Sequence, residues 1–182
     1  MGELRERKLR RLFDAIDTDG NGVITRHDLT LLSARYISEL GLEPGQPQAE
    51  RTTAVTERFW DQLIAPMDAD GSGEVTPAEL HAALEHLLLG DRAAYAATIR
   101  ASNDVYFDLC DTDGSGQISE REFVRLMSTT CGIPAGDAAR TFRSLIPAGQ
   151  ETMTRENWHQ AMLAFFYDED PDAPANNLFG QL

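Results

Sequence analysis

The sequence predicts an all-α protein: four helix-loop-helix units in two pairs, folded compactly, with short β-bridges between paired loops. Three observations predict this. Three twelve-residue segments repeat one pattern of acidic residues and glycine, apolar residues flank each segment at helical spacing, and a fourth segment keeps the apolar spacing without the acidic residues. A chain of 182 residues is long enough to bury the core that such an arrangement requires.

The repeated segments are Asp17–Asp28, Asp68–Glu79 and Asp111–Glu122. Each has carboxylates at positions 1 and 3, an oxygen-bearing side chain at position 5, glycine at position 6 and a carboxylate at position 12. Calcium binds six to eight oxygen atoms, and a loop of this length supplies them from positions 1, 3, 5, 7, 9 and 12. Glycine is needed at position 6 because the backbone turns sharply there. Each segment is therefore predicted to bind one calcium ion.

Six residues of each loop are the predicted ligands, and the residue at position 7 contributes its backbone carbonyl. The first set is Asp17, Asp19, Asn21, Val23, Thr25 and Asp28. The second set is Asp68, Asp70, Ser72, Glu74, Thr76 and Glu79. The third set is Asp111, Asp113, Ser115, Gln117, Ser119 and Glu122.

The first loop differs from the other two at position 12, where it has Asp28 in place of a glutamate. Aspartate is shorter by one methylene, so binding calcium through both carboxylate oxygens is harder. Magnesium, which is smaller and six-coordinate, then competes better. We expect magnesium to compete with calcium mainly at this first site.

Helices are predicted on both sides of each loop from the apolar spacing. In the first half, 1–90, the exiting helix of the first unit covers about 26–40, a proline- and glycine-rich turn follows at 41–48, and the next entering helix covers about 50–67. The second half, 91–182, is expected to pack on the first, and Leu88–Arg92 is the predicted junction. The apolar residues that define the helices of the three complete units are Leu9, Leu12, Phe13, Ile16, Leu29, Leu32, Trp60, Leu63, Ile64, Met67, Leu80, Leu84, Leu87, Tyr106, Phe107, Cys110, Phe123, Leu126 and Met127.

Three units predict a fourth, because an unpaired unit would leave one apolar face uncovered. Phe142 and Leu145 lead into the segment Ile146–Asn157, which has Met153 at the position of the bridging residue. The carboxylates at positions 1, 3 and 12 are missing, and Gln150 and Asn157 are the only side-chain oxygens in suitable places. We expect this loop to bind no ion and to support the third unit.

The net charge of −14 argues against nucleic acid or an anionic membrane surface as a partner. No apolar segment is long enough to cross a membrane, and the N-terminus lacks the apolar core of a signal peptide. Cys110 and Cys131 form no disulfide pattern. These features predict a cytoplasmic protein, which we expect to be a monomer.

The chain resembles the sarcoplasmic calcium-binding proteins and their calerythrin-like bacterial relatives, which are four-EF-hand proteins. The resemblance rests on the three loops, the long helices of the first pair, one defunct hand and the tail Phe165–Leu182, and it covers nearly the whole chain. It implies that the tail returns to the body of the protein, with Leu178 and Phe179 as its apolar contacts. The resemblance transfers poorly to individual sites, since family members differ in which hand is defunct.

Two functions in calcium binding stay open. Calcium sensors expose a methionine-rich groove, whereas calcium buffers barely open; the five scattered methionines favour a buffer, and displacement of the tail by an unidentified protein partner would make a sensor. Related scaffolds also carry luciferins or act as photoproteins, in which case Trp60, Tyr106, Phe142 and Trp158 would line a ligand pocket. No arrangement of serine, cysteine or histidine indicates catalysis, so we expect no enzyme.

Overall fold

The computed structural model describes residues 2–89, 100 and 103–181. It confirms the all-α class and the helix-loop-helix units. The helices and strands in chain order are α1 (Glu3–Ile16), α2 (Arg26–Glu39), α3 (Pro47–Phe59), α4 (Pro77–Leu89), an unlabelled helix at 103–110, β1 (Gln117–Ser119), α6 (Glu120–Cys131), α7 (Ala135–Leu145), β2 (Thr152–Thr154) and α8 (Arg155–Tyr167).

In the first pair, α1 and α2 flank the first loop, and α3 and α4 flank the second. Helix α3 begins at Pro47, earlier than expected, because proline suits the first turn of a helix, where its missing N–H costs nothing. It continues through a π-helical turn, Trp60–Ile64, and a 3₁₀ turn, Ala65–Met67, to the first residue of the second loop. Ile24 and Val75 exchange two backbone hydrogen bonds of 2.8 Å, which is the expected bridge between the loops.

In the second pair, β1 and β2 form a short antiparallel sheet in which Ile118 lies opposite Met153. This register confirms the fourth unit and the position predicted for Met153. The helices that follow both strands are capped at their N-termini: the side chain of Ser119 accepts a hydrogen bond from the amide of Glu122, and that of Thr154 accepts one from the amide of Asn157. Both loops of the pair therefore have the same backbone frame.

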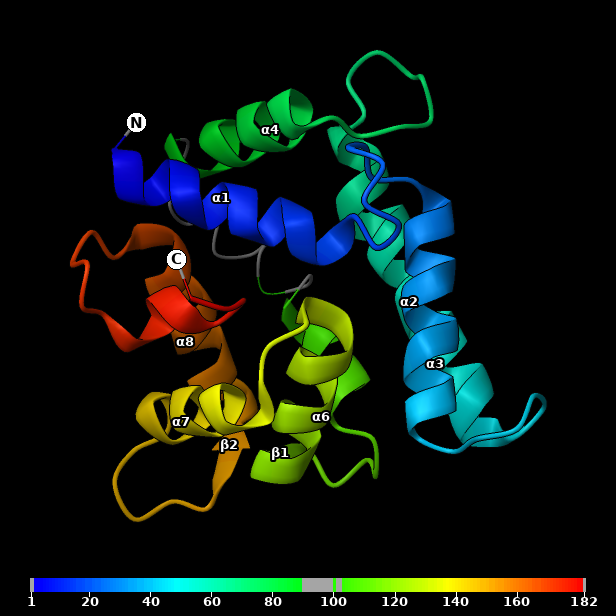
Figure 1. The fold of residues 1–182 in the computed structure, drawn as a ribbon, viewed down its shortest axis with the longest axis vertical. Coiled ribbons are helices and arrows are strands. Elements are labelled where there is room, and N and C mark those ends of the chain that lie inside the picture. The colour runs from blue at the N-terminus through cyan, green and yellow to red at the C-terminus, as the bar shows by residue number, and fades with distance from the viewer. Residues whose placement is uncertain (1, 90–99, 101–102, 182) are drawn as a thin grey trace.

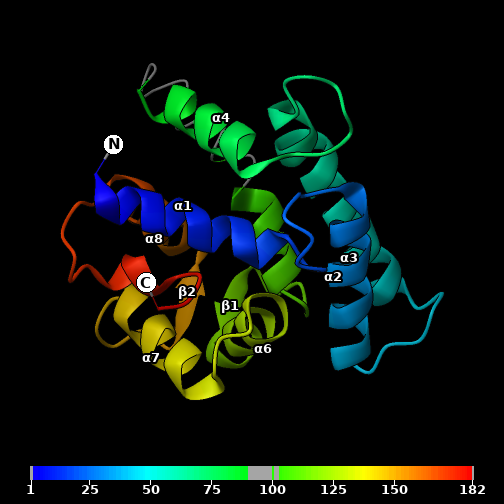
Figure 2. The same cartoon turned by 45° about the horizontal axis from the view of Figure 1, so that its top comes forward.

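One core joins the two halves. The apolar residues predicted to face it are mainly buried, with Leu63 and Leu145 partly exposed; the side chain of Leu87 lies outside the described part of the structure. Helix α1 contacts α6 and α8 of the second half, and α2 contacts α6. Figures 1 and 2 show α2 and α3 side by side, with α1 crossing toward α8. The predicted junction Leu88–Arg92 begins in the last turn of α4, and its remaining residues, like the boundary between 1–90 and 91–182, lie outside the described residues.

The tail after α8 returns to the body of the molecule, as the family resemblance implied. A short 3₁₀ helix, Pro174–Asn177, contacts both α7 and α8. Leu178 and Phe179 are 0% and 1% exposed, and the Phe179 ring lies 5.0 Å from that of Phe165. The tail is thus part of the core. Within the described part of the chain, no helix has the length and apolar character needed to cross a membrane.

Candidate metal centres

Each of the three acidic loops gathers its carboxylates into one small cluster. In each cluster, one carboxylate oxygen per residue lies within 4.8 Å of the others. The clusters are Asp17, Asp19 and Asp28 in the first loop, Asp68, Asp70 and Glu79 in the second, and Asp111, Asp113 and Glu122 in the third. The residue at position 12 is buried in the first and third loops and partly exposed in the second.

The first aspartate of each loop is held by backbone amides. The Gly22 amide donates to Asp17 over 3.0 Å, and the Gly73 and Gly116 amides donate to Asp68 and Asp111 over 2.9 Å. All three glycines have positive φ angles, of 90°, 84° and 80°, which a Cβ atom would resist. The backbone therefore orients the carboxylate at position 1 toward the centre of the loop.

The residue at position 12 joins the two ends of its loop. One oxygen of Glu122 accepts hydrogen bonds from the Thr112 amide at 3.0 Å and the Thr112 hydroxyl at 2.9 Å, and the other accepts from the Ser119 amide at 2.9 Å. Asp28 is shorter but reaches the matching amides of Thr18 and Thr25, at 2.9 and 2.8 Å. The threonine at position 2 in these two loops was not among the predicted residues, because the ligand pattern leaves that position free.

These hydrogen bonds favour the charged carboxylates. Burial tends to raise the pKa of Glu122, but hydrogen bonds from Ser119 and Thr112 outweigh burial and leave that pKa lowered. The hydrogen bonds from Thr76 lower the pKa of Glu79, and those from Ser115 lower the pKa of Asp113. In the second and third loops, hydrogen bonds thus stabilise the charged form of Glu79, Asp113 and Glu122.

The remaining predicted ligands lie in the same loops. In the second and third loops, the serine hydroxyl at position 5 donates to the carbonyl at position 7: Ser72 to Glu74 over 3.2 Å, and Ser115 to Gln117 over 2.9 Å. In the first loop, the Asn21 side-chain amide donates to Asp19 over 3.0 Å, and Val23 directly precedes the bridging residue Ile24.

The hydroxyls at position 9 point toward the carboxylate at position 12. Thr25 donates to Asp28 over 2.9 Å, Thr76 to Glu79 over 2.8 Å, and Ser119 to Glu122 over 2.7 Å. The structure therefore brings the side chains at both ends of each loop together.

The donor set of these clusters is made of oxygen alone. Hard cations such as Ca²⁺ and Mg²⁺ prefer oxygen ligands, whereas zinc prefers the nitrogen and sulfur of histidine and cysteine. The three loops thus fit the ion that the sequence predicts for them. The fourth loop has no cluster of this kind among its described residues. There, Asn157 accepts hydrogen bonds from the Thr154 amide and hydroxyl at 3.1 and 2.8 Å, so it keeps the helix cap and lacks the charge.

Comparison with known proteins agrees with this geometry. Two family models match the chain, an EF-hand domain at residues 8–32 and an EF hand at residues 103–127. The chain is 31% identical over 147 residues to the probable calcium-binding protein CML21 of Oryza sativa subsp. japonica, covering 78% of this chain and 68% of that protein. It is also 21% identical over 161 residues to calerythrin of Saccharopolyspora erythraea, covering 88% and 90%.

Solved structures share the fold over the full chain. The coelenterazine-binding protein of Renilla muelleri superimposes with a TM-score of 0.83 at 22% identity, covering 100% of both chains. A sarcoplasmic calcium-binding protein from amphioxus superimposes with a TM-score of 0.73 at 18% identity, covering 100% of this chain and 99% of the other. These likenesses confirm the four-hand fold. CML21 is, by its name, a probable calcium-binding protein. The chain belongs to the EF-hand calcium-binding proteins, and it is similar to calerythrin over most of its length.

Proposed function

We propose that the protein binds three calcium ions, one in each of its first three loops, and none in the fourth. The observation that carries this proposal is the convergence of three carboxylates in each of those loops, on a backbone frame that the fourth loop shares without the charges. The proposed ligands are the eighteen residues that the sequence predicts. When bound, the ion neutralises the carboxylates, and the loop residues supply its coordinating oxygens.

Calorimetric titration with calcium tests the proposal. We expect three ions per chain, and two in each of the variants Asp17→Asn, Asp68→Asn and Asp111→Asn, because each variant removes the carboxylate at position 1. Glu151→Gln, an exposed change in the fourth loop, is the matched control and should leave three. Fewer than three ions in the unmodified protein, or a lost ion in the control, would contradict the assignment.

We propose a calcium buffer as the role of these sites. The described methionines of the core, Met67, Met127, Met153 and Met162, are all buried and lie in different elements, so they form no exposed methionine-rich surface. Calcium should therefore leave the binding of a hydrophobic dye low. Dye fluorescence that rises with calcium would favour the alternative, a sensor whose tail is displaced by a protein partner.

A small-ligand carrier is the second candidate, since the coelenterazine-binding protein shares the fold. A cavity of about 40 Å³ lies in the apolar core, and at its wall the buried side-chain nitrogen of Asn103 has no hydrogen-bond partner among the described residues. Ligand pockets usually enclose about 300–1,000 Å³, so this cavity would have to expand. Of the four aromatic residues predicted to line such a pocket, only Tyr106 does so; Trp60 instead faces a surface groove between α2 and α3. An absorbance spectrum of the purified protein without bands beyond its aromatic absorption would count against a bound chromophore.

The cellular location, the oligomeric state and the partners of the protein are also part of the proposal. We propose a cytoplasmic monomer, supported by two cysteines that stay unpaired. The strong negative charge disfavours nucleic acid and anionic membranes as partners. Gel filtration with and without calcium tests the oligomeric state, and elution as a dimer would contradict it.

A further inference from the structure

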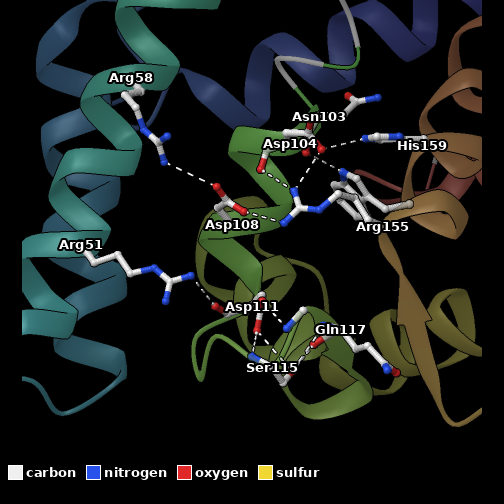
Figure 3. A network of polar contacts seen from close by, with 12 residues as sticks. Arg51, Arg58, Asn103, Asp104, Asp108, Asp111, Ser115, Gln117, Arg155 and His159 are labelled. Atoms are coloured by element: carbon white, nitrogen blue, oxygen red, sulfur yellow. Dashed lines mark hydrogen bonds and ion pairs between the residues drawn. The ribbon is translucent and has the colours of Figure 1, made fainter.

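Helix α3 of the first pair touches the ion loop of the third hand. The Gln48 side chain donates a hydrogen bond of 2.7 Å to the backbone carbonyl of Thr112, and Arg51 donates one of 3.5 Å to the carbonyl of Asp111. These carbonyls belong to loop positions 2 and 1. Figure 3 shows Arg51 reaching from α3 toward Asp111. Two side chains of the first half thus hold the beginning of the third loop.

The contact extends along the whole of α3. Arg58 forms an ion pair with Asp108 over 3.6 Å, and the ring of Phe59 meets that of Tyr106 edge to face at 5.3 Å. The contacting positions 48, 51, 55, 58 and 59 recur at intervals of three and four residues, so they share one face of the helix. Between the polar ends, Val55 is 2% exposed. Helix α3 therefore packs lengthwise against the entering helix of the third hand.

Glycine at loop position 4 makes room for this contact. Gly114 has a φ angle of +71°, and a Cβ atom built on it would lie 3.1 Å from a terminal nitrogen of Arg51. A side chain at this position would be strained and would press on the guanidinium group. The third loop thus accommodates Arg51 closely.

The same helix leads to the second ion loop. After Phe59, the π-helical turn and the 3₁₀ turn continue without interruption to Asp68, the first proposed ligand of site two. Site three has no ion-binding partner in its own pair, because its strand β1 pairs with the defunct fourth loop. In the described part of the chain, α1 and α2 contact α6, the helix that leaves the third loop, whereas the polar side chains of α3 reach the third loop itself and its entering helix.

We propose that α3 couples calcium sites two and three, and that Gln48 is a positioning residue for the third loop. This inference rests on the proposed calcium binding of both loops. Calcium in site two fixes the C-terminal end of α3, which keeps Gln48 and Arg51 against the third loop and reduces the conformational entropy lost when that loop closes on its ion. By linkage, calcium in site three strengthens site two by the same factor.

Gln48→Leu is the test variant, since leucine keeps the helix propensity and removes the donor without altering charge. Arg51 is less suitable, because its removal would also change the electrostatic potential at the ion. Glu50→Gln, at an exposed position of the same helix, is the matched control. Site-resolved titration by NMR can follow the amides of Gly73 and Gly116, since each donates to the first carboxylate of its own loop.

In the unmodified background, the Asp68→Asn change should weaken calcium binding at site three by about fivefold or more, the size of a typical coupling. With Gln48→Leu present, the same change should have little further effect at site three, whereas with Glu50→Gln the full effect should persist. An effect that is absent in the unmodified background, or unchanged by Gln48→Leu, would overturn the coupling alone. A Gly116 amide that never responds to calcium would overturn the calcium assignment of the third loop, and the coupling with it.

Discussion

At the scale of single residues, the side chain at loop position 12 combines two roles. Asp28, Glu122 and Asn157 each complete a capping box with the hydroxyl residue three positions earlier. In the first and third loops this side chain also bonds to amides at the start of the loop. In the fourth loop the cap alone is kept. The local fold of this loop therefore does not need a carboxylate at position 12.

The length of Asp28 is the basis of a first prediction. Its carboxylate is fully buried and already spans both ends of its loop, which favours the smaller, six-coordinate magnesium ion. Asp28→Glu should increase the preference of site one for calcium over magnesium by about tenfold. Titration of the Gly22 amide resonance with calcium, with and without millimolar magnesium, measures this preference. If Asp28→Glu leaves the ratio of the calcium and magnesium affinities unchanged, the expected magnesium competition at this site is contradicted.

The environment of Cys131 gives a second prediction. Burial raises the pKa of this thiol from 9.0 to about 11, with partial opposition from its hydrogen bond with Thr130 and from the charge of Arg11. A rise of this size lowers the thiolate fraction near pH 8 by about 100-fold. Burial also raises the pKa of Cys110. Both cysteines should react with iodoacetamide far more slowly in the folded protein than in urea, as mass spectrometry would show. Equal rates would contradict the burial of Cys110 and the raised pKa of the partly buried Cys131.

At the scale of elements, the cap of α8 gives a third prediction. Thr154→Ala removes the hydroxyl that caps the helix and should lower the free energy of unfolding by about 1 kcal/mol. Since the fourth loop is proposed to hold no ion, the calcium stoichiometry should stay at three. Urea unfolding in EDTA measures the first effect and calorimetry the second. Ser38→Ala, at an exposed helical position, is the control; a Thr154→Ala variant that unfolds at the same free energy as this control would contradict the role of the cap.

The elements also show how far the sequence could predict this structure. The loops, the flanking helices and the register of Met153 follow from local pattern, because ligand spacing and apolar periodicity are properties of neighbouring residues. The early start of α3 at Pro47 and its π-helical turn at Trp60–Ile64 did not appear in that pattern. Neither did the contacts of Gln48 and Arg51 with the third loop, since the sequence around a polar helical residue does not show which distant backbone group it will contact.

At the scale of the whole molecule, the tail connects the two ends of the chain. Lys8 of α1 is 1% exposed and donates a hydrogen bond of 2.7 Å to the Asp168 carbonyl, and Arg5 pairs with Glu169 over 3.2 Å. Beyond these polar contacts, Phe179 fills a space between Tyr106 and Phe165. The first helix, the last helix and the tail thus stabilise one another.

Removal of the Phe179 ring is the fourth prediction. Phe179→Ala should lower the free energy of unfolding by about 3–5 kcal/mol, because it leaves a cavity in a closely packed core. The exposed change Gln181→Ala should have little effect. Hydrophobic dye binding by the folded Phe179→Ala variant should rise, since the core beneath the tail becomes accessible. A small loss of stability with unchanged dye binding would contradict the tail's role as a part of the core.

The largest effect expected for the whole molecule is that of removing calcium. Within each of the three clusters, the carboxylates repel one another when no cation is bound. The net charge of −14 adds to that repulsion. At a calcium concentration 1,000 times the dissociation constant, each site should add about 4 kcal/mol to the free energy of unfolding, provided that the unfolded chain does not bind the ion. EDTA should therefore lower the melting temperature strongly. Sodium chloride should recover part of the loss, since at 0.1 M it screens interactions between exposed charges that lie more than about 10 Å apart. A melting temperature that responds to neither EDTA nor salt would show that the loops are neither filled by calcium nor strained by their own charge.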